Sequence, residues 1–251
     1  MYQLSLDGKV ALITGASRGI GRAIALALAD AGADLAICAR NLPPLEEVAQ
    51  EITAKGRQAL ALSVNVRHKE DLVNLVDKTM ERFGRIDILV NNAGINFTLG
   101  SILDLEEWAW DNVMNTNLKA PFLLSQMVGK IMVQQKSGNI INVASIEGLR
   151  ASPVMGAYSV SKAALEMLSR VLAADLRRHN IRVNTISPGL VRTEFARPLW
   201  EGRGREGAPE IPAWQRLAEP EEIAGIVVFL CSDAASFISG DNIVLDNGAS
   251  A

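Results

Sequence analysis

A tyrosine and a lysine, Tyr158 and Lys162, stand four residues apart in a stretch whose composition predicts a helix. At this spacing the two side chains lie on one face of a helix. A free tyrosine has a pKa of about 10, which is too high for proton exchange near neutral pH. A neighbouring ammonium stabilises the phenolate and lowers that pKa, so the pair predicts acid–base chemistry on an alcohol or a carbonyl oxygen. Taken alone, the same spacing also fits an ordinary surface pair.

A serine, Ser145, lies thirteen residues before the tyrosine and just after the apolar segment 139–143. A short apolar run of this kind predicts a buried strand. In open α/β sheets, ligands bind beyond the carboxyl ends of the strands. The Ser145 hydroxyl is therefore expected at the edge of the sheet where a ligand would bind.

A glycine-rich segment, residues 14–21, lies between the first expected strand and the first expected helix. Its glycines allow a tight turn and a close approach of the backbone to a pyrophosphate, while the following helix directs free N–H groups and its dipole at the anion. This position favours dinucleotide binding over a plain connecting loop. The residues assigned to this contact are Gly15, Ser17, Arg18, Gly19, Ile20 and Gly21.

The second expected strand, residues 34–39, indicates which dinucleotide fits. A carboxylate near its end would bind the ribose 2′-hydroxyl of NAD, whereas positive charge there would bind the 2′-phosphate of NADP. The strand ends without an acidic residue, Arg40 follows it, and Arg18 can approach from the glycine turn. Guanidinium groups match phosphate geometry, and Ser17 and Asn41 can add hydrogen bonds. The sequence favours NADP(H), and the alternative is that both arginines are solvated surface residues.

Apolar strand-like runs that alternate with stretches at helical period must position these residues. Strands are expected at residues 9–14, 34–39, 58–64, 86–90, 139–143, 181–186 and 242–245. Helices are expected at residues 20–31, 43–55, 69–83, 104–135 (as two pieces, with Pro121 opening the second), 155–179 and 221–231. The strands are almost continuously apolar, which is typical of a parallel sheet covered by helices on both faces. The sequence thus predicts a single doubly wound α/β domain of the Rossmann type over residues 1–251.

The composition of the 251 residues excludes several classes of protein. Hydrophobic residues make up 49% and charged residues 21%, which is ordinary for a folded globular chain. The net charge of −3 offers no basic excess for nucleic acid, and the longest nearly unbroken apolar stretch, residues 223–231, is too short to span a membrane. Two histidines and no cysteine–histidine cluster argue against a zinc or iron site, so no metal is expected.

The two cysteines, Cys38 and Cys231, lie 193 positions apart in strongly apolar surroundings. A disulfide between them is one alternative, but two buried thiols in a reducing compartment are favoured. The first residues of the chain also lack the features of a secretory signal peptide. These observations together predict a cytoplasmic protein.

Taken together, the motifs resemble the classical subfamily of the short-chain dehydrogenases/reductases, from about residue 6 to residue 248. The segments that carry the resemblance are residues 14–21, 91–94 (Asn-Asn-Ala-Gly), 115–117 (Asn-Thr-Asn), 142–145, 158–162 and 187–189 (Ser-Pro-Gly). So many ordered motifs at compatible spacings are specific, although each alone is weak. The resemblance implies an oxidoreductase that transfers a hydride between a nicotinamide cofactor, here NADP(H), and a carbonyl or secondary alcohol.

The resemblance also implies roles for individual residues. Tyr158 would be the general acid in reduction and the base in oxidation, with Lys162 lowering its pKa and holding the nicotinamide ribose. Ser145 would hydrogen-bond the substrate oxygen, and Asn117 would position a water that leads protons toward Lys162. Asn91, Ala93 and Gly94 are implied to stabilise the central strand and to pass beneath the ribose of the cofactor. Cofactor contacts at the nicotinamide end are implied for Pro188, Gly189, Val191 and Thr193. Asn91 and Asn117 could equally tie down loops.

One position departs from the family pattern. The third strand of the family usually ends in an aspartate that bonds the adenine amino group, whereas this chain has Asn65, followed by Val66. An amide oxygen also accepts a hydrogen bond from that amine. Asn65 and Val66 are therefore expected among the cofactor contacts.

The resemblance implies a substrate pocket that is mostly apolar and suits a hydrophobic ketone or an acyl chain. Its expected members include Asn96, Phe97, Glu147, Met155, Leu190 and Trp200. Glu147 would bind a hydroxyl or an amine, or else remain an exposed carboxylate at the rim. The irregular stretch 194–218, which contains several prolines and glycines, is expected to be a functional loop at this pocket. Its arginines and glutamates nearly balance, so it offers no clear basic dock for an acidic carrier protein.

The identity of the substrate and the assembly stay open at this level. The family also contains 3-oxoacyl-carrier-protein reductases and sugar or polyol dehydrogenases with the same catalytic set. A regulator that senses NADP without turnover is a non-enzymatic alternative. The resemblance further implies a homotetramer, a dimer of dimers whose contacts involve the helices over residues 121–135 and 155–179. Small or apolar residues on the second helix fit such a contact, namely Ala157, Ala163, Ala164 and Leu168.

Overall fold

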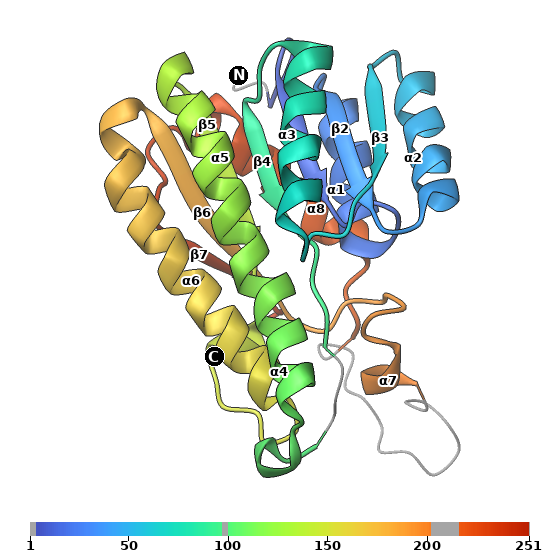
Figure 1. The fold of residues 1–251 in the computed structure, drawn as a ribbon, viewed down its shortest axis with the longest axis vertical. Helices are drawn as coiled ribbons and strands as arrows, with labels where there is room; N and C mark the ends of the chain where they lie inside the picture. Colours follow the sequence, from blue (N-terminus) through green and yellow to red (C-terminus); the bar gives the residue numbers. More distant parts are fainter. Residues whose placement is uncertain (1–3, 97–99, 202–215, 251) are drawn as a thin grey trace.

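Seven strands form one sheet in the order β3-β2-β1-β4-β5-β6-β7 (Figure 1). The computed structural model describes residues 4–96, 100–201 and 216–250. The strands are β1 (Val10–Thr14), β2 (Asp34–Ala39), β3 (Ala59–Ser63), β4 (Ile88–Asn91), β5 (Gly138–Val143), β6 (Ile181–Pro188) and β7 (Asn242–Leu245). Neighbouring strands are parallel throughout, so each connection must cross from one end of the sheet to the other. The predicted parallel sheet is confirmed.

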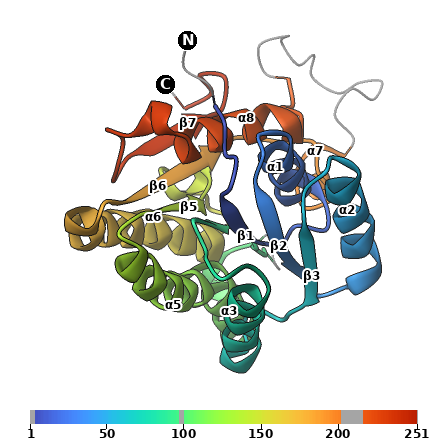
Figure 2. The ribbon, with the colours of Figure 1, turned by 90° about the horizontal axis from the view of Figure 1, so that it is seen from above.

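Helices cover both faces of this sheet, as the sequence predicts. The helices are α1 (Gly19–Asp30), α2 (Leu42–Ala54), α3 (Lys69–Phe83), α4 (Glu107–Met114), α5 (Ala120–Gln135), α6 (Gly156–Leu176), α7 (Arg197–Trp200) and α8 (Pro220–Cys231). Figure 2 shows α1, α2 and α8 on one face of the sheet and α3, α5 and α6 on the other. The molecule is therefore a single doubly wound α/β domain.

The core explains why the strands show no alternation of polar and apolar residues. Successive side chains of a strand point to opposite faces of the sheet. On β1, Leu12 packs in the cluster that includes residues of α3 and α5, while Ala11 and Ile13 pack in the cluster that includes residues of α1 and α8. All three side chains are fully buried. A strand covered on both faces must be apolar at every position, as these three residues are.

The helical region before β5 differs from the expectation. The sequence predicts two pieces with Pro121 opening the second, but the chain stays helical from α4 through a π-helical segment, Asn115–Lys119, into α5. Pro121 falls in the first turn of α5, directly after this wider turn. Proline lacks an N–H, and the altered hydrogen-bond pattern of a π turn accommodates it without ending the helix.

The stretch expected to be an irregular loop, residues 194–218, contains a short helix, α7, with Pro198 in its first turn. Proline at this position costs no hydrogen bond, because the first N–H groups of a helix have no partner within the helix. A single parallel bridge between Val191 and Ala218 joins the two sides of the stretch. Residues 202–215 of the expected loop, and Phe97 of the expected pocket, lie outside the described residues.

Three absences expected from the sequence can be compared with the described residues. Cys38 and Cys231 are both buried and unpaired, which agrees with two buried thiols rather than a disulfide. Among residues 4–96, 100–201 and 216–250, no helix combines the length and apolar character needed to cross a bilayer. The same ranges contain no group of three or more side chains suited to hold a metal ion.

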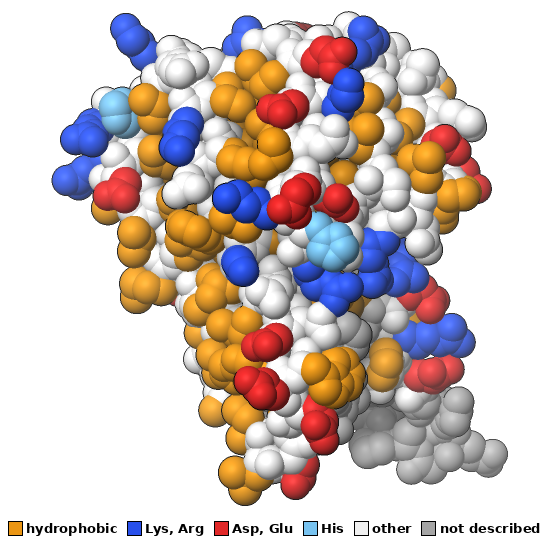
Figure 3. All heavy atoms as spheres, viewed as in Figure 1, with side chains coloured by type: hydrophobic (Ala, Val, Ile, Leu, Met, Phe, Trp, Pro, Cys, Tyr) orange, Lys and Arg blue, Asp and Glu red, His pale blue; other side chains and the backbone are white. Residues whose placement is uncertain are grey.

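The outer surface of α5 and α6 is unusually apolar for a solvent-facing helix pair. Figure 3 shows hydrophobic side chains gathered along these two helices. The most exposed of them are Phe122 on α5 and Val160, Met167 and Val171 on α6, each between 43% and 55% exposed. Exposed apolar surface of this kind marks a site of association on many proteins.

Candidate active site

A cavity of about 2100 Å³ opens beyond the carboxyl ends of the strands. The strand order reverses between β1 and β4, and the segments that follow these two strands both line the cavity. Ligands of open α/β sheets bind at such a reversal point. Pockets for single small molecules measure roughly 300–1,000 Å³, so this cavity has room for a dinucleotide together with a substrate.

The glycine turn between β1 and α1 has the conformation that the sequence predicts. Gly15 and Gly19 have φ values of 68° and 56°, in the left-handed region that favours glycine. A Cβ atom on Gly21 would lie 2.3 Å from the Gly15 carbonyl oxygen, so only glycine fits there. No side chain caps the N-terminus of α1, which leaves its first N–H groups available to an anion in the cavity.

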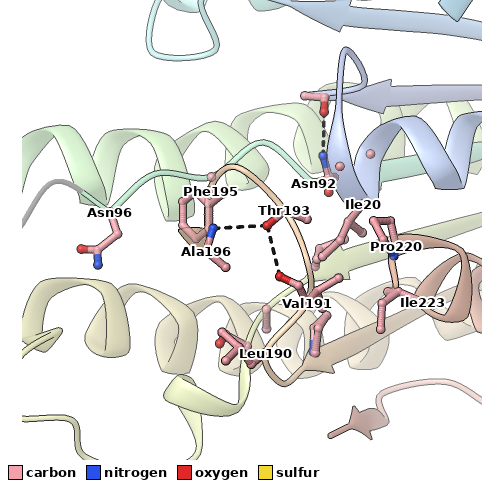
Figure 4. Close-up of a pocket in the computed structure, with 18 of the residues that line it drawn as sticks. Ile20, Asn92, Asn96, Leu190, Val191, Thr193, Phe195, Ala196, Pro220 and Ile223 are labelled. Atoms are coloured by element: carbon pink, nitrogen blue, oxygen red, sulfur yellow. Dashed lines mark hydrogen bonds between the residues drawn. The ribbon is translucent and has the colours of Figure 1, made fainter. Parts of the chain in front are cut away.

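The end of β4 holds this turn in place (Figure 4). Asn92 Nδ2 donates to the carbonyl oxygens of Thr14 (2.8 Å) and Gly15 (3.0 Å). In return, Thr14 Oγ1 accepts hydrogen bonds from the backbone N–H groups of Asn92 (3.1 Å) and Ala93 (3.0 Å). Asn92 is not among the contacts expected from the sequence, although it belongs to the segment 91–94.

Two guanidinium groups without acceptors lie at the glycine-turn end of the cavity. Arg18 and Arg40 both line the cavity and are exposed. Neither side chain makes a hydrogen bond or an ion pair with any residue that the structure describes. Arg22, by contrast, pairs with Glu51 at 2.6 Å. The donors of Arg18 and Arg40 therefore remain available to a ligand, and Ser17 and Asn41 also line the cavity.

The predicted catalytic side chains converge at the opposite end of the same cavity. Tyr158 and Lys162 lie on α6 and are 8% and 3% exposed, and Ser145 follows β5. Lys162 Nζ donates a hydrogen bond of 2.7 Å to the Val143 carbonyl and lies 5.6 Å from the centroid of the Tyr158 ring. All three side chains line the cavity, so the structure brings together residues that are seventeen positions apart in the chain.

Burial shifts the pKa of both ionisable groups in this cluster. It raises the pKa of Tyr158 to about 12, an effect that hydrogen bonding to Ser145 reduces and the negative charge of Glu147 increases. It also lowers the pKa of Lys162 to about 8. In the chain by itself the net shift of the Tyr158 pKa is therefore upward, because the loss of solvation outweighs the hydrogen bond with Ser145.

Asn117 lies in the π-helical segment between α4 and α5, and both its amide oxygen and its amide nitrogen make hydrogen bonds. Its Oδ1 accepts from the Ile95 N–H (2.8 Å), and its Nδ2 donates to the Ile95 carbonyl (2.9 Å) and to Ser161 Oγ (3.0 Å). Asn117 does not itself line the cavity. The side chain fixes the loop after β4 against α6, which agrees with the alternative that it ties down a loop.

Glu147 is not an exposed carboxylate at the rim. Only 8% of the residue is exposed, and its Oε1 accepts hydrogen bonds from Arg150 Nε (3.1 Å) and Nη2 (2.7 Å). Its backbone N–H donates to Ser145 Oγ at 3.2 Å. Both members of this ion pair line the cavity. Arg150 is not among the site residues expected from the sequence, although its position three residues after Glu147 is a signal for such a pair.

Comparison with known proteins places this geometry in a family. The family model described as enoyl-(acyl carrier protein) reductase matches residues 15–250. Human dehydrogenase/reductase SDR family member 4 is 39% identical over 244 residues, which cover 97% of this chain and 88% of that protein. The crystal structure of a short-chain type dehydrogenase/reductase from Mycobacterium marinum superposes with a TM-score of 0.90 at 38% identity, covering 98% and 97% of the two chains. That of NAD⁺-bound xylitol dehydrogenase gives 0.88 at 33% identity, covering 96% and 99%.

The chain belongs to the short-chain dehydrogenase/reductase family. Members of this family are oxidoreductases that interconvert alcohols and carbonyl compounds with a nicotinamide cofactor, and the chain is an enzyme of this class. The family resemblance that the motifs indicate is thus confirmed over nearly the whole chain.

The short-chain dehydrogenase fold brings most of the other expected cofactor contacts to the cavity wall. The expected contacts found there are Gly15, Ser17, Gly19, Ile20, Gly21, Asn65, Val66, Ala93, Gly94, Pro188, Gly189, Val191 and Thr193. Thr193 Oγ1 accepts from the Ala196 N–H at 3.2 Å and donates to the Val191 carbonyl at 3.4 Å, which orders the chain after β6 (Figure 4). Asn65 Oδ1 already accepts from Arg67 Nε at 3.3 Å.

Asn91 is the exception among the expected cofactor contacts. Its side chain is buried away from the cavity and donates to Asn142 Oδ1 (2.8 Å) and Ser125 Oγ (3.2 Å). Asn142 in turn donates to Ser169 Oγ at 2.7 Å. This network joins β4 and β5 to α5 and α6, so Asn91 acts on the packing of the sheet, as the structural alternative holds.

The described residues that are expected to bind the substrate lie on the wall of the same cavity. The expected residues Asn96, Met155, Leu190 and Trp200 line it together with Glu147. Phe195 also lines the cavity, and its ring centroid lies 6.0 Å from that of Tyr158. This aromatic cover helps to keep the tyrosine out of water and contributes to the burial that raises its pKa.

Proposed function

We propose that the protein is an NADP(H)-dependent short-chain dehydrogenase/reductase in which Tyr158 is the general acid and base. The observation that carries this proposal is the shared cavity. One end combines the glycine turn with two arginines that lack acceptors, and the other end combines Ser145, Tyr158 and Lys162. A binding protein for NADP would need only the first end, so the buried acid–base cluster favours an enzyme over a sensor.

The catalytic step is assigned to side chains that already face one another. When bound, the nicotinamide cofactor supplies or accepts the hydride. In reduction, Tyr158 Oη donates its proton to the substrate oxygen, and in oxidation the phenolate takes that proton back. Ser145 Oγ hydrogen-bonds the same oxygen and holds it against the tyrosine, which keeps the reacting atoms in place.

Lys162 and Asn117 support the tyrosine. Lys162 Nζ has one donor on the Val143 carbonyl and further donors free for the hydroxyls of the nicotinamide ribose. A Cβ atom on Gly94 would lie 3.5 Å from Lys162 Nζ and 3.6 Å from Asn117 Oδ1, so both polar groups border one small space. We assign to Asn117 the placement of a water in this space, through which protons reach Lys162.

NADP(H) is favoured over NAD(H) by the side chains around the 2′-position. The NAD⁺-bound xylitol dehydrogenase shares this fold, so the fold alone does not select the cofactor. Ala39 ends β2 without a carboxylate, and Arg18 and Arg40 have free donors for a phosphate. The adenine end would be held near Asn65 and Val66, and the nicotinamide end near Pro188, Gly189, Val191 and Thr193.

The decisive experiment measures NADPH consumption by the purified protein with a panel of ketones, 3-oxoacyl thioesters and sugars. Turnover with at least one of them, lost in Tyr158→Phe, supports the proposal. The 3-oxoacyl thioesters and sugars distinguish the carrier-protein reductase and polyol dehydrogenase alternatives. Tight NADPH binding without turnover on the whole panel would favour the sensor.

We also propose that α5 and α6 pair with their copies and that two such dimers form a homotetramer. Phe122, Val160, Met167 and Val171 supply exposed apolar surface for this contact, and Ala163 and Leu168 lie on the same helix face or beside it. Met114, Leu118 and Phe122 line a small apolar hollow at one end of the surface. Light scattering at micromolar concentration should give four times the chain mass of 27.0 kDa, and a monomer would reject the assembly.

The segment 194–218 is proposed as the part of the domain that adapts to the substrate, because Phe195, Leu199 and Trp200 from it line the cavity. Exchanging Trp200 for alanine should change KM among the accepted ketones more than it changes KM for NADPH.

A cytoplasmic location is proposed from the two unpaired buried thiols, which suit a reducing compartment. Fractionation of cells that produce the full chain tests it.

A further inference from the structure

The carboxylate of Glu147 lines the cavity although only 8% of the residue is exposed. Burying a carboxylate is costly unless both oxygens find partners. Arg150 hydrogen-bonds only Oε1, and no other residue that the structure describes donates to Oε2. Some polar atoms in the described residues, such as Asn91 Oδ1 and Ser159 Oγ, are completely buried and have no hydrogen-bond partner. Oε2 of Glu147 is not one of these completely buried atoms. One carboxylate oxygen is therefore without a partner and open to the cavity.

Glu147 lies beside the atoms that would bind the substrate carbonyl. Its backbone N–H donates to Ser145 Oγ, and its charge is close enough to raise the pKa of Tyr158. A carbonyl oxygen held between Ser145 and Tyr158 would leave its neighbouring carbon atoms in the same cavity that the Glu147 side chain lines. The partner of Oε2 is thus expected on the substrate, one or two carbons from the reacting centre.

The ion pair also indicates the chemistry of that partner. Arg150 neutralises Glu147, so the pair offers no net charge to attract an ammonium. Nη1 of Arg150 makes no hydrogen bond with any described residue, so the pair presents one free acceptor, Oε2, and free donors at the guanidinium. A hydroxyl can donate to the first and accept from the second, which a plain alkyl chain cannot do.

We propose that Glu147 and Arg150 recognise a hydroxyl group next to the reacting carbonyl, so that the enzyme acts preferentially on hydroxyketones and the corresponding diols. The inference rests on the proposed function, because it assumes that Ser145 and Tyr158 bind the carbonyl oxygen. The apolar residues Met155, Leu190 and Phe195 then surround the carbon skeleton, and the ion pair is the polar anchor. A substrate without the hydroxyl leaves Oε2 unpaired in a buried site, which costs binding free energy.

The test compares a matched pair of substrates, 2-butanone and 3-hydroxy-2-butanone, which differ by one hydroxyl beside the carbonyl. The quantity measured is the ratio of their kcat/KM values with NADPH in wild type and in Glu147→Ala. Taking the ratio within each protein cancels the intrinsic reactivity of the ketones and any general change in the tyrosine pKa. Loss of a hydrogen bond to a charged group predicts that the ratio falls about tenfold or more in the variant.

Two further variants separate recognition from a structural role. Arg150→Met should lower the ratio by about threefold, because it removes the guanidinium donors but keeps the acceptor. Glu166→Ala is the matched control, since Glu166 and its partner Arg170 on α6 are 11% and 53% exposed, against 11% and 52% for Glu147 and Arg150. Glu166 does not line the cavity, so its loss should leave the ratio unchanged.

The outcomes distinguish this inference from the proposed function. Reduction of both ketones by wild type, with a ratio that Glu147→Ala leaves unchanged, overturns the hydroxyl recognition but leaves the oxidoreductase assignment intact. An equal fall of the ratio in Glu166→Ala overturns it as well, because the effect would then come from lost packing. If wild type reduces no carbonyl compound of the wider panel, the proposed function fails and the inference fails with it.

Discussion

The two ends of the cavity recognise their ligands by opposite means. At the glycine-turn end, Arg18 and Arg40 are exposed, and the other contacts are backbone groups shaped by glycine. At the catalytic end, Tyr158 and Lys162 are almost completely buried, and their pKa values are displaced in opposite directions, to about 12 and about 8. The glycine-turn end thus offers exposed positive charge to its ligand. At the catalytic end, the removal of water changes the pKa values of the side chains.

This difference has a physical reason. A phosphate is recognised by a permanent charge, and exposed guanidinium groups keep that charge at any accessible pH. A proton donor must instead respond to its surroundings, and removal of water is the strongest way to change a pKa. Substitutions at the two ends should therefore have separable effects, the first on which cofactor binds and the second on whether a proton moves.

The largest effect is expected at the catalytic end. Tyr158→Phe keeps the ring and its packing against Phe195 but removes the transferable proton. Turnover should fall by roughly 10²–10⁴-fold, the usual scale of general acid–base catalysis. Initial rates on an accepted ketone measure this fall, and fluorescence titration should show NADPH affinity within about threefold of wild type. Near-normal turnover would contradict the role of Tyr158. A loss of NADPH affinity as large as the loss of turnover would show that the two ends of the cavity do not act separately.

A smaller effect is expected at the glycine-turn end. A charge-assisted hydrogen bond is worth roughly 1.5–3 kcal/mol, or about tenfold to a hundredfold in affinity. Wild type should therefore prefer NADPH over NADH by at least about tenfold in kcat/KM, and Ala39→Asp combined with Arg40→Leu should reverse this preference. Initial rates with each cofactor on one ketone provide the test.

The control for this charge reversal is Arg22→Leu. Arg22 is an arginine of α1 that pairs with Glu51 and does not line the cavity, so its removal should leave the cofactor preference unchanged. A wild type that prefers NADH, or an Arg40→Ala variant with an unaltered ratio, contradicts the assignment of Arg40 to the 2′-phosphate.

The backbone of the glycine turn can be tested through a pair of glycines. Gly21→Ala puts a Cβ atom 2.3 Å from the Gly15 carbonyl oxygen, whereas Gly225→Ala on α8 meets no atom within 4 Å. The first change should destabilise the protein by roughly 1–3 kcal/mol and weaken NADPH binding. The second should be neutral or stabilise the helix by up to about 1 kcal/mol. Urea unfolding and NADPH titration of both variants check this, and equal behaviour of the two would show that the turn tolerates a side chain.

The smallest effect is expected on stability, from two buried cysteines that have no role in the proposed mechanism. Burial raises the pKa of the Cys38 and Cys231 thiols from 9.0 to about 12, although neither is used in the proposed mechanism. Between pH 9 and 12 the unfolded chain releases these protons while the folded protein retains them, so the free energy of unfolding falls as the pH rises. Each thiol should contribute a loss of roughly 1 kcal/mol between pH 9 and 10.

Thermal melting at pH 8, 9 and 10 checks this linkage. The melting temperature of wild type should fall a few degrees more over this range than that of the double variant Cys38→Ala/Cys231→Ala. Parallel curves for the two proteins would show that the thiols ionise equally in both states. Burial would then not explain the pKa shifts of Tyr158 and Lys162 either, and the contrast between the two ends of the cavity would need another cause.

Much of the architecture could be predicted from local patterns. The apolar runs determined the strands, and three expected spans agree fully with β2, α3 and β7. The glycine turn and the Tyr158–Lys162 spacing were also readable, because both depend on residues close together in the chain. The continuity of the helix through Pro121 was not, since a π turn leaves no clear mark in the order of apolar residues.

The sequence by itself determined which residues could carry charge, protons and tight turns. Tertiary structure decided what those residues do. It buried Asn91 in a network with Asn142, placed Asn117 against the Ile95 backbone, and paired Glu147 with Arg150 in the cavity wall. It also buried Tyr158, which raises the pKa of its phenol. Each of these outcomes depends on how much water the fold removes from a side chain and on which distant groups replace it, and neither quantity is encoded in local spacing.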